Sequence, residues 1–296
     1  MLQEEPEEAQ ACDVALEPRD WVLHIDEALL VVNKPAGLPT LPDGYQADAP
    51  YVVGQLQEAF GRLWVVHRLD RETSGVLVLA RTAEAHRVLN SQFQEREIAK
   101  IYHALAVGTP AWDVPQGGFA QRTIHLHLRA DGDRRHRTVI DRAHGKPSTT
   151  SFRVLERLGH YTLIEARPKT GRPHQIRAHL AAERLPLVGD VLYASQGGGL
   201  QGDAGVALRR LLVDDAPLAR LGLHALALTL EHPSSGAAVT FEAPYPPDFA
   251  EALARLRGDW NHGGSAKPPC GTEDTEKPGI RGQESGLSGP SVVIDR

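Results

Sequence analysis

Residues 63–79 read LWVVHRLDRETSGVLVL, and this stretch organises the chain around it. Its two ends, residues 63–66 and 76–79, are apolar and rich in β-branched side chains, which predicts two buried strands. The charged segment between them ends in Thr-Ser-Gly, which predicts a loop and a turn. Asp70 would then be held on a rigid scaffold, as a reactive carboxylate must be. A surface turn with a structural salt bridge would produce the same pattern.

Composition limits the class of protein. The chain has 296 residues, of which 41% are hydrophobic and 24% charged, as in globular proteins of one large or two small domains. No apolar run is long enough to span a bilayer, and the acidic N-terminus does not resemble a signal peptide. The two cysteines, Cys12 and Cys270, fit neither a disulfide framework nor a zinc site. We therefore expect a cytoplasmic protein.

The negative net charge of −6 is concentrated in the tails. Residues 1–20 contain seven acidic side chains and one basic, and residues 259–296 contain six acidic and four basic. The segment between them is close to neutral, so the charge of the whole chain is no objection to a nucleic-acid partner.

Three regions follow from the pattern along the chain. We expect residues 1–20 to be a loose acidic tail, residues 21–258 to form one catalytic domain, and residues 259–296, rich in Gly, Pro and Ser, to be disordered. Within the domain, strands outnumber helices and do not alternate with them regularly, which favours an α+β fold.

Hydrophobic periodicity predicts the elements of that domain. Predicted strands cover residues 21–25, 29–32, 101–107, 123–129, 151–155, 161–166, 223–230 and 239–241. Predicted helices run from the cap Thr82 to about 96, from Pro173 to about 184, and over 248–256. The glycines of residues 197–205 predict a flexible loop.

Asp70 lies between Arg68 and Arg71, and nearby positive charge keeps a carboxylate ionised at neutral pH. An ionised carboxylate can act as a nucleophile or a base. The second candidate is the segment TGRPHQIR at residues 170–177, where a glycine turn meets a helix start that favours anions. Arg177 should lie at the border of the buried face, where it could hold an inward carboxylate with two hydrogen bonds. A solvated helix start with two surface arginines fits the segment equally well.

Three further features have a simple structural explanation and a functional one. Tyr102, on the strand over 101–107, is either a core side chain or a ring that stacks on a base. The cluster Arg134, Arg135 and Arg137 is either a solvated face or a phosphate contact. His125 and His127 share a polar strand face, and no spacing of histidines predicts a metal site.

These segments together resemble one family. HRLDRETSG at 67–75, KIY at 100–102 and GRPHQIR at 171–177 are similar to the motifs of the RluA-type pseudouridine synthases. VGDVLY at 188–193, LHA at 223–225 and FEAP at 241–244 fit the same family, so the resemblance extends over residues 22–249.

The resemblance implies a fold, an activity and a set of site residues. It implies a mostly antiparallel central sheet crossed by a cleft, and isomerisation of uridines in ribosomal or transfer RNA by base flipping, without cofactor or metal. Asp70 corresponds to the essential aspartate, Arg177 to the arginine that holds it by a salt bridge, Tyr102 to the stacking tyrosine, and Arg68 to the arginine that fills the vacated stack. Further RNA contacts are expected at Lys34, Arg71, Arg134, Arg135, Arg137, Arg172 and His174.

Many members of that family carry an additional N-terminal RNA-binding module of the S4 type. Only about twenty residues precede Trp21, so we expect this chain to lack one and to act as a monomer on an RNA stem-loop, away from membranes and without a nucleotide cofactor. Two other functions remain to be weighed: an RNA-binding or ribosome-assembly factor that has kept the fold without activity, and a hydrolase that binds a metal through the histidines.

Overall fold

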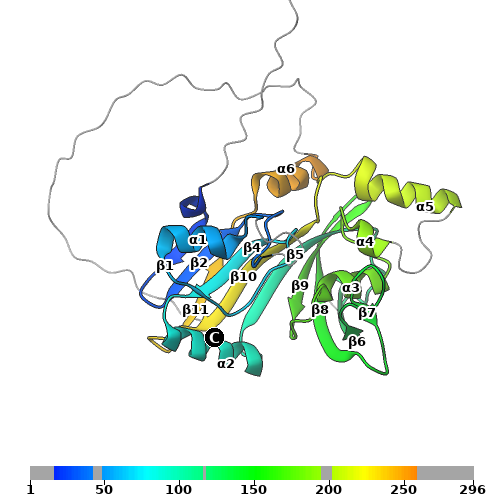
Figure 1. Ribbon diagram of the computed structural model, residues 1–296. Helices are drawn as coiled ribbons and strands as arrows, with labels where there is room; N and C mark the ends of the chain where they lie inside the picture. Colours follow the sequence, from blue (N-terminus) through cyan, green and yellow to red (C-terminus); the bar gives the residue numbers. More distant parts are fainter. Residues whose placement is uncertain (1–16, 43–48, 116–117, 195–201, 259–296) are drawn as a thin grey trace, which may run out of the picture. The chain divides into compact units, whose positions relative to one another are not determined.

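A computed structural model describes residues 17–42, 49–115, 118–194 and 202–258. In these ranges eleven strands form one sheet in the order β1-β2-β4-β10-β5-β9-β8-β6-β7, with β11 beside β10 and β3 beside β4 (Figure 1). The strands are β1 (Val22–Ile25), β2 (Leu29–Lys34), β3 (Trp64–Val65), β4 (Ser74–Ala80), β5 (Ala99–Val107), β6 (Gln121–Arg129), β7 (Val139–Ile140), β8 (Lys146–Leu158), β9 (Tyr161–Pro168), β10 (Leu223–Glu231) and β11 (Ala238–Glu242). Only β4 and β10 pair in parallel, which confirms the predicted α+β fold with a mostly antiparallel sheet.

Short helices connect and cover these strands. They are α1 (Val52–Phe60), α2 (Ala83–Glu95), α3 (Gln175–Ala182), α4 (Val191–Ala194), α5 (Gly202–Arg209) and α6 (Pro247–Leu256), with a 3₁₀ turn at Pro18–Trp21 and a π-helical turn at Arg210–Asp214. The predicted cap of α2 is confirmed, because the Thr82 side chain accepts a hydrogen bond from the backbone N–H of Ala85 at 3.1 Å.

Helices α1 and α2 lie on opposite faces of the part of the sheet that contains β2 and β4 (Figure 1). Both strands are buried along most of their length, and alternate side chains point to opposite faces. Leu77 and Leu79 of β4 pack with α1, whereas Val76 and Val78 pack with α2. Double coverage explains why β4 is a continuous apolar run after its first two residues rather than an alternating strand.

The other half of the sheet is covered in the same way. Ile176 and Leu180 of α3 pack against one face of β5, β8 and β9, and Phe249 and Leu253 of α6 pack against the other. The sequence predicted that all four side chains point inward, and each is at most 6% exposed.

The structure differs from the expected elements at four places. Helix α3 begins at Gln175 rather than at Pro173, because His174 adopts a left-handed backbone conformation with φ of 50°. Part of the predicted glycine loop, from Gly202 on, is helix α5, and residues 197–201 lie outside the described residues. Helix α1 was not predicted, and β3 covers only two of the four residues expected to form a strand.

The predicted tails fall mostly outside the description. Residues 1–16 and 259–296 are not described, whereas Pro18–Trp21 forms the 3₁₀ turn that leads into β1. Among the described residues, no helix is long and apolar enough to cross a membrane.

The junction of β4, β10 and β5 positions the candidate site. Gly75 pairs with Ala225 on β10, and Ala225 in turn pairs with Tyr102 on β5. A Cβ atom at Gly75 would lie 2.1 Å from the carbonyl oxygen of Ala225, and the φ of Gly75 is 115°. Only glycine meets both conditions without strain, so the last residue of HRLDRETSG sets how closely β4 approaches β10.

Candidate active site

The loop that carries Asp70 is fixed at both ends by buried histidines. The Val78 N–H donates to Nε2 of His67 at 2.9 Å, and burial lowers the pKa of His67 to about 3, so this ring is the neutral form that can accept. At the other end, the Ser74 hydroxyl lies 2.9 Å from Nδ1 of His224, and both residues are fully buried. This Ser–His pair is thus structural, because nothing outside the protein can reach it.

The middle of the loop is tied to the turn that follows β2. The Thr40 hydroxyl donates to the carbonyl of Leu69 at 2.8 Å and accepts from its N–H at 3.2 Å. The Gly37 N–H donates to the carbonyl of Arg71 at 2.9 Å. The Thr73 N–H donates to the carbonyl of Asp70 at 3.1 Å and closes the loop on itself. Asp70 therefore stands on a backbone with little freedom.

Lys34 is also part of this scaffold, so the prediction that it contacts RNA is wrong. Its side chain is fully buried, and its Nζ donates to the carbonyls of Pro35, Leu38 and Arg71 at 2.7, 2.7 and 3.0 Å. Burial is the main cause that lowers the pKa of Lys34 to about 7. Three carbonyl acceptors match the three N–H groups of the ammonium form, so Lys34 joins the turn to the Asp70 loop as a cation.

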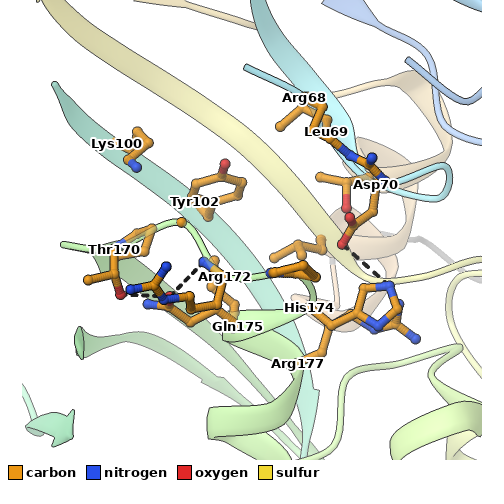
Figure 2. A pocket seen from close by; sticks show the side chains of 16 residues that line it. Arg68, Leu69, Asp70, Lys100, Tyr102, Thr170, Arg172, His174, Gln175 and Arg177 are labelled. Atoms are coloured by element: carbon orange, nitrogen blue, oxygen red, sulfur yellow. Dashed lines mark hydrogen bonds and ion pairs between the residues drawn. The ribbon is translucent and has the colours of Figure 1, made fainter. Parts of the chain in front are cut away.

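Asp70 and Tyr102 face the same cavity, which holds about 170 Å³ (Figure 2). The walls come from the Asp70 loop, from β5 and from the turn and first residues of α3. Asp70 is the only carboxylate among the described lining residues, whereas the cationic lining residues are Arg68, Lys100, Arg172 and Arg177. One negative group surrounded by positive ones suits both a reacting carboxylate and an anionic ligand.

Tyr102 is half-buried and faces the cavity. It packs against the hydrophobic clusters on both sides of the cavity and also lines the cavity itself. Burial raises the pKa of Tyr102, and the nearby charge of Asp70 adds to that effect. The phenol is therefore protonated at neutral pH and can donate a hydrogen bond or a proton.

The ion pair expected between Arg177 and Asp70 is wrong: Arg177 pairs with Asp190 instead. Its Nε and Nη2 each donate to a carboxylate oxygen of Asp190 at 2.8 Å, and the Asp190 side chain is only 1% exposed. The guanidinium also lies over the ring of Tyr193, 4.8 Å from its centroid. The sequence predicted that Arg177 would hold an inward carboxylate through two hydrogen bonds, and only the identity of that carboxylate differs.

Within the described ranges, His174 is the only basic side chain that lies within 4.0 Å of the Asp70 carboxylate. Its Nε2 lies 3.9 Å from Oδ2 of Asp70 (Figure 2), and its Nδ1 lies 3.0 Å from the hydroxyl of Tyr193. The Thr138 N–H donates to the same hydroxyl at 2.8 Å. Burial lowers the pKa of His174, and the charge of Asp70 opposes this shift. At neutral pH the ring is therefore uncharged beside the carboxylate.

Gln175 fixes the turn that faces Tyr102 across the cavity. Its amide oxygen accepts from the Thr170 hydroxyl at 2.7 Å and from the Arg172 N–H at 3.1 Å, as Figure 2 shows. Its amide nitrogen donates to the carbonyl of Thr149 and the hydroxyl of Thr150, at 3.0 and 2.9 Å. No role was predicted for Gln175, Lys100, Asp190 or Tyr193, although all four lie inside the motifs at residues 100–102, 171–177 and 188–193.

The predicted RNA contacts are distributed over two regions. Arg68, Arg172 and His174 line the cavity, and Arg71 lines a neighbouring hollow that also reaches Asp70. Arg134 and Arg135 are exposed after β6, away from the lining of the cavity. Arg137 is engaged within the protein, because its Nε donates to the carboxylate of Asp133 at 2.6 Å. Apart from Lys34, the residues that the sequence assigned to RNA binding remain predicted contacts.

The histidines are arranged as the sequence indicated. His125 and His127 are exposed on β6, and His179 is buried with its Nε2 2.9 Å from the hydroxyl of Ser148. In the part of the chain that the structure describes, no group of three or more His, Cys, Asp or Glu side chains could hold a metal ion.

Comparison with known proteins identifies the class. A sequence model of the RNA pseudouridylate synthase family matches residues 28–182. The ribosomal large subunit pseudouridine synthase D of Pseudomonas aeruginosa is 36% identical over 268 residues, which cover 88% of this chain and 78% of that protein. The enzyme of the same name from Xanthomonas campestris is 38% identical over 243 residues, or 80% of this chain and 70% of that one.

Solved structures agree. The human RNA pseudouridylate synthase domain containing 4 protein has a TM-score of 0.60 and 27% identity over 80% of this chain and 92% of its own. The human RNA pseudouridylate synthase domain containing 1 protein has a TM-score of 0.58 and 26% identity over 80% of this chain and 94% of its own. The chain thus belongs to the RNA pseudouridylate synthase family. It is an RNA pseudouridine synthase, an isomerase.

Proposed function

We propose that this enzyme converts uridine to pseudouridine in the RNA of the large ribosomal subunit, with the target base turned out of its stack into the cavity between Asp70 and Tyr102. The observation that carries the proposal is that one carboxylate, the only one among the described lining residues, and a half-buried phenol line the same cavity. The printed names of the bacterial relatives support the choice of ribosomal RNA.

The recessed position of the Asp70 carboxylate supports base flipping. Asp70 is recessed in a cavity whose walls come from three segments of the chain, and its side chain is 27% exposed. A base that stays stacked within RNA cannot bring its glycosidic bond to such a group. Extruding a nucleotide costs a few kcal/mol, less in a loop than in a helix. In this proposal Tyr102 recovers part of that cost by stacking on the extruded base.

Each cavity residue has a distinct task in this proposal. Asp70 acts on the target nucleoside as the ionised carboxylate, either as nucleophile or as base. Tyr102, a phenol at neutral pH, stacks on the uracil and donates to it. Arg68 and Arg172 bind the RNA beside the target. Arg177 lines the cavity but is a positioning residue, because its guanidinium pairs with Asp190 and lies over the ring of Tyr193, whose hydroxyl contacts His174.

The test of the substrate class uses purified enzyme and unmodified transcripts. Transcripts of large-subunit ribosomal RNA and of a set of transfer RNAs are incubated with the wild-type enzyme, and pseudouridine is mapped in each. We expect defined sites in the ribosomal transcript and none in the transfer RNAs. The same sites should be missing from total RNA of cells that lack the gene. Modification confined to transfer RNA would contradict the proposed substrate, and no pseudouridine in any transcript or in the cellular comparison would contradict the proposed function.

A further inference from the structure

A second hollow adjoins the first on the side of helix α2. It lies between the end of α2, the loop before Asp70, the start of β5 and the turn after β9. Six residues line both hollows, so the two form a continuous surface: Arg68, Lys100, Tyr102, Thr170, Gly171 and Arg172. An RNA strand that leaves the first cavity on this side enters the second directly.

The second hollow is basic and has no acidic lining residue. Its cations are Arg68, Arg96, Lys100, Lys169 and Arg172. Within the described residues, none of the five forms an ion pair. Of these five side chains, only that of Arg172 donates to another described residue, from Nε and Nη2 to the carbonyl of Pro147 at 3.4 Å. Clustered cations without counter-charges repel one another, and an anionic ligand would remove that cost.

The hollow also has an apolar and aromatic side. Phe93 and Val66 line it, and both are half-buried. The ring of His67 stacks on Phe93 with centroids 4.8 Å apart and an interplanar angle of 23°, which fixes the orientation of the phenyl ring. Burial lowers the pKa of His67 to about 3, so that this support carries no charge. A planar base can stack against such a wall whatever its sequence.

The end of helix α2 sets the backbone conformation of Arg96. It caps α2 in a left-handed conformation with φ of 63°, and its N–H donates to the carbonyl of Gln92. Lys169 also lines the hollow, on the turn after β9, and its side chain is exposed. Two exposed cationic side chains that line the same hollow suit a phosphate bound there.

We infer that this second hollow is a subsite for the nucleotide next to the target uridine, with Arg96 and Lys169 binding its phosphate and Phe93 and Val66 contacting its base. The inference rests on the proposed function for the identity of the ligand as RNA. Because the contact with this nucleotide depends on charge and stacking, the subsite tolerates any base.

The test measures binding without requiring turnover. The probe is a fluorescein-labelled oligouridylate of eight nucleotides, and the dissociation constant is measured over a range of salt concentrations for wild type and for Arg96→Gln/Lys169→Gln. Loss of two phosphate contacts should weaken binding by about tenfold at low salt and make the slope of log K against log salt shallower by about 1.4. Both substituted side chains are exposed, and circular dichroism should show an intact fold.

The matched control is Arg157→Gln/Arg210→Gln, which removes the same charge from exposed positions outside both hollows. The control should keep the wild-type salt slope. Equal slopes for all three proteins would overturn the subsite, as would an equal loss in the control. If the wild type binds the probe as expected but makes no pseudouridine, the proposed function fails while the subsite stands, so the two failures are distinguishable.

Discussion

At the scale of single residues, the basic side chain beside Asp70 is not the one that the sequence predicted. His174 faces Asp70 at 3.9 Å, while Arg177 is committed to Asp190. A neutral imidazole leaves the carboxylate unpaired and available, whereas an imidazolium would bind it. In the proposed mechanism, the protonation state of His174 therefore decides how free Asp70 is to react.

This arrangement predicts a specific pH dependence. His174 has a pKa below its ordinary 6.5, so it becomes charged only as the pH falls below that value. The groups that face it are Asp70, Arg177, Asp190, Arg68 and Tyr193. Protonation should pair His174 with Asp70 and slow the reaction. We expect the single-turnover rate of the wild type to fall on the acid side, and the rate of His174→Gln to persist to lower pH.

Single-turnover rates at saturating RNA between pH 5 and 8 check this prediction. Tyr193→Phe serves as the companion variant, because it removes the hydroxyl that holds Nδ1 of His174 but leaves the imidazole in place. The companion should keep an acid limb. An identical acid limb in wild type and His174→Gln would rule out the proposed pairing.

The pair of Arg177 and Asp190 predicts a loss of stability. Arg177→Ala leaves Asp190 buried at 1% exposure without its partner, which should lower the free energy of unfolding by about 3–5 kcal/mol. The double variant Arg177→Ala/Asp190→Ala removes both charges and should lose less than the sum of the two single variants. Urea denaturation of the four proteins tests this, and strictly additive losses would show that the pair is not coupled.

At the scale of elements, local pattern predicts what depends on neighbours in the sequence. Strands β5 and β6 were predicted because their side chains alternate between apolar and polar or small, and α2 because Thr82 precedes a helical period. The contacts that build the site were not predictable in this way. Ser74 meets His224 across 150 residues of sequence, and nothing local indicates that Lys34 would end among three carbonyls.

The junction of β4 and β10 predicts that Gly75 cannot be replaced. Gly75→Ala combines a positive φ with a Cβ that would lie 2.1 Å from the Ala225 carbonyl oxygen, and should lower the free energy of unfolding by about 3 kcal/mol or more. Gly37 is the matched control, because its φ of 84° is similarly positive but no atom lies within 4 Å of the added Cβ. Gly37→Ala should cost about 1–2 kcal/mol.

Urea midpoints of the two glycine variants give the comparison. The difference between the two losses of stability measures the effect of the close approach of β4 to β10 separately from the effect of backbone strain. Equal losses would mean that backbone strain alone accounts for the requirement for glycine at position 75, and that β10 does not constrain β4.

At the scale of the whole molecule, the charge of the chain is divided. The net charge of −6 matches the charge of residues 1–20 alone, while the lining of the two hollows is strongly basic. Composition predicted that the middle segment is close to neutral. The fold brings its cations together in the two hollows, because these residues come from α2, β5 and the turns beside α3.

That division predicts an effect of the N-terminal residues on RNA association. Deletion of residues 2–16 removes five acidic side chains and no basic one. The association rate with the oligouridylate should rise severalfold at low salt and change little at about 0.5 M salt, where the Debye length is only a few ångströms. Stopped-flow fluorescence measures both rates. An increase of the same size at both salt concentrations would contradict an electrostatic origin.

The account as a whole depends on the carboxylate of Asp70. The most direct measurement is single-turnover formation of pseudouridine by Asp70→Asn at saturating RNA, together with its RNA dissociation constant and its urea midpoint. We expect the rate to fall by about a thousandfold or more, with affinity and stability close to those of the wild type, because asparagine keeps the shape and loses the charge. A variant that forms pseudouridine at the wild-type rate would contradict the assignment of Asp70 as the reacting group.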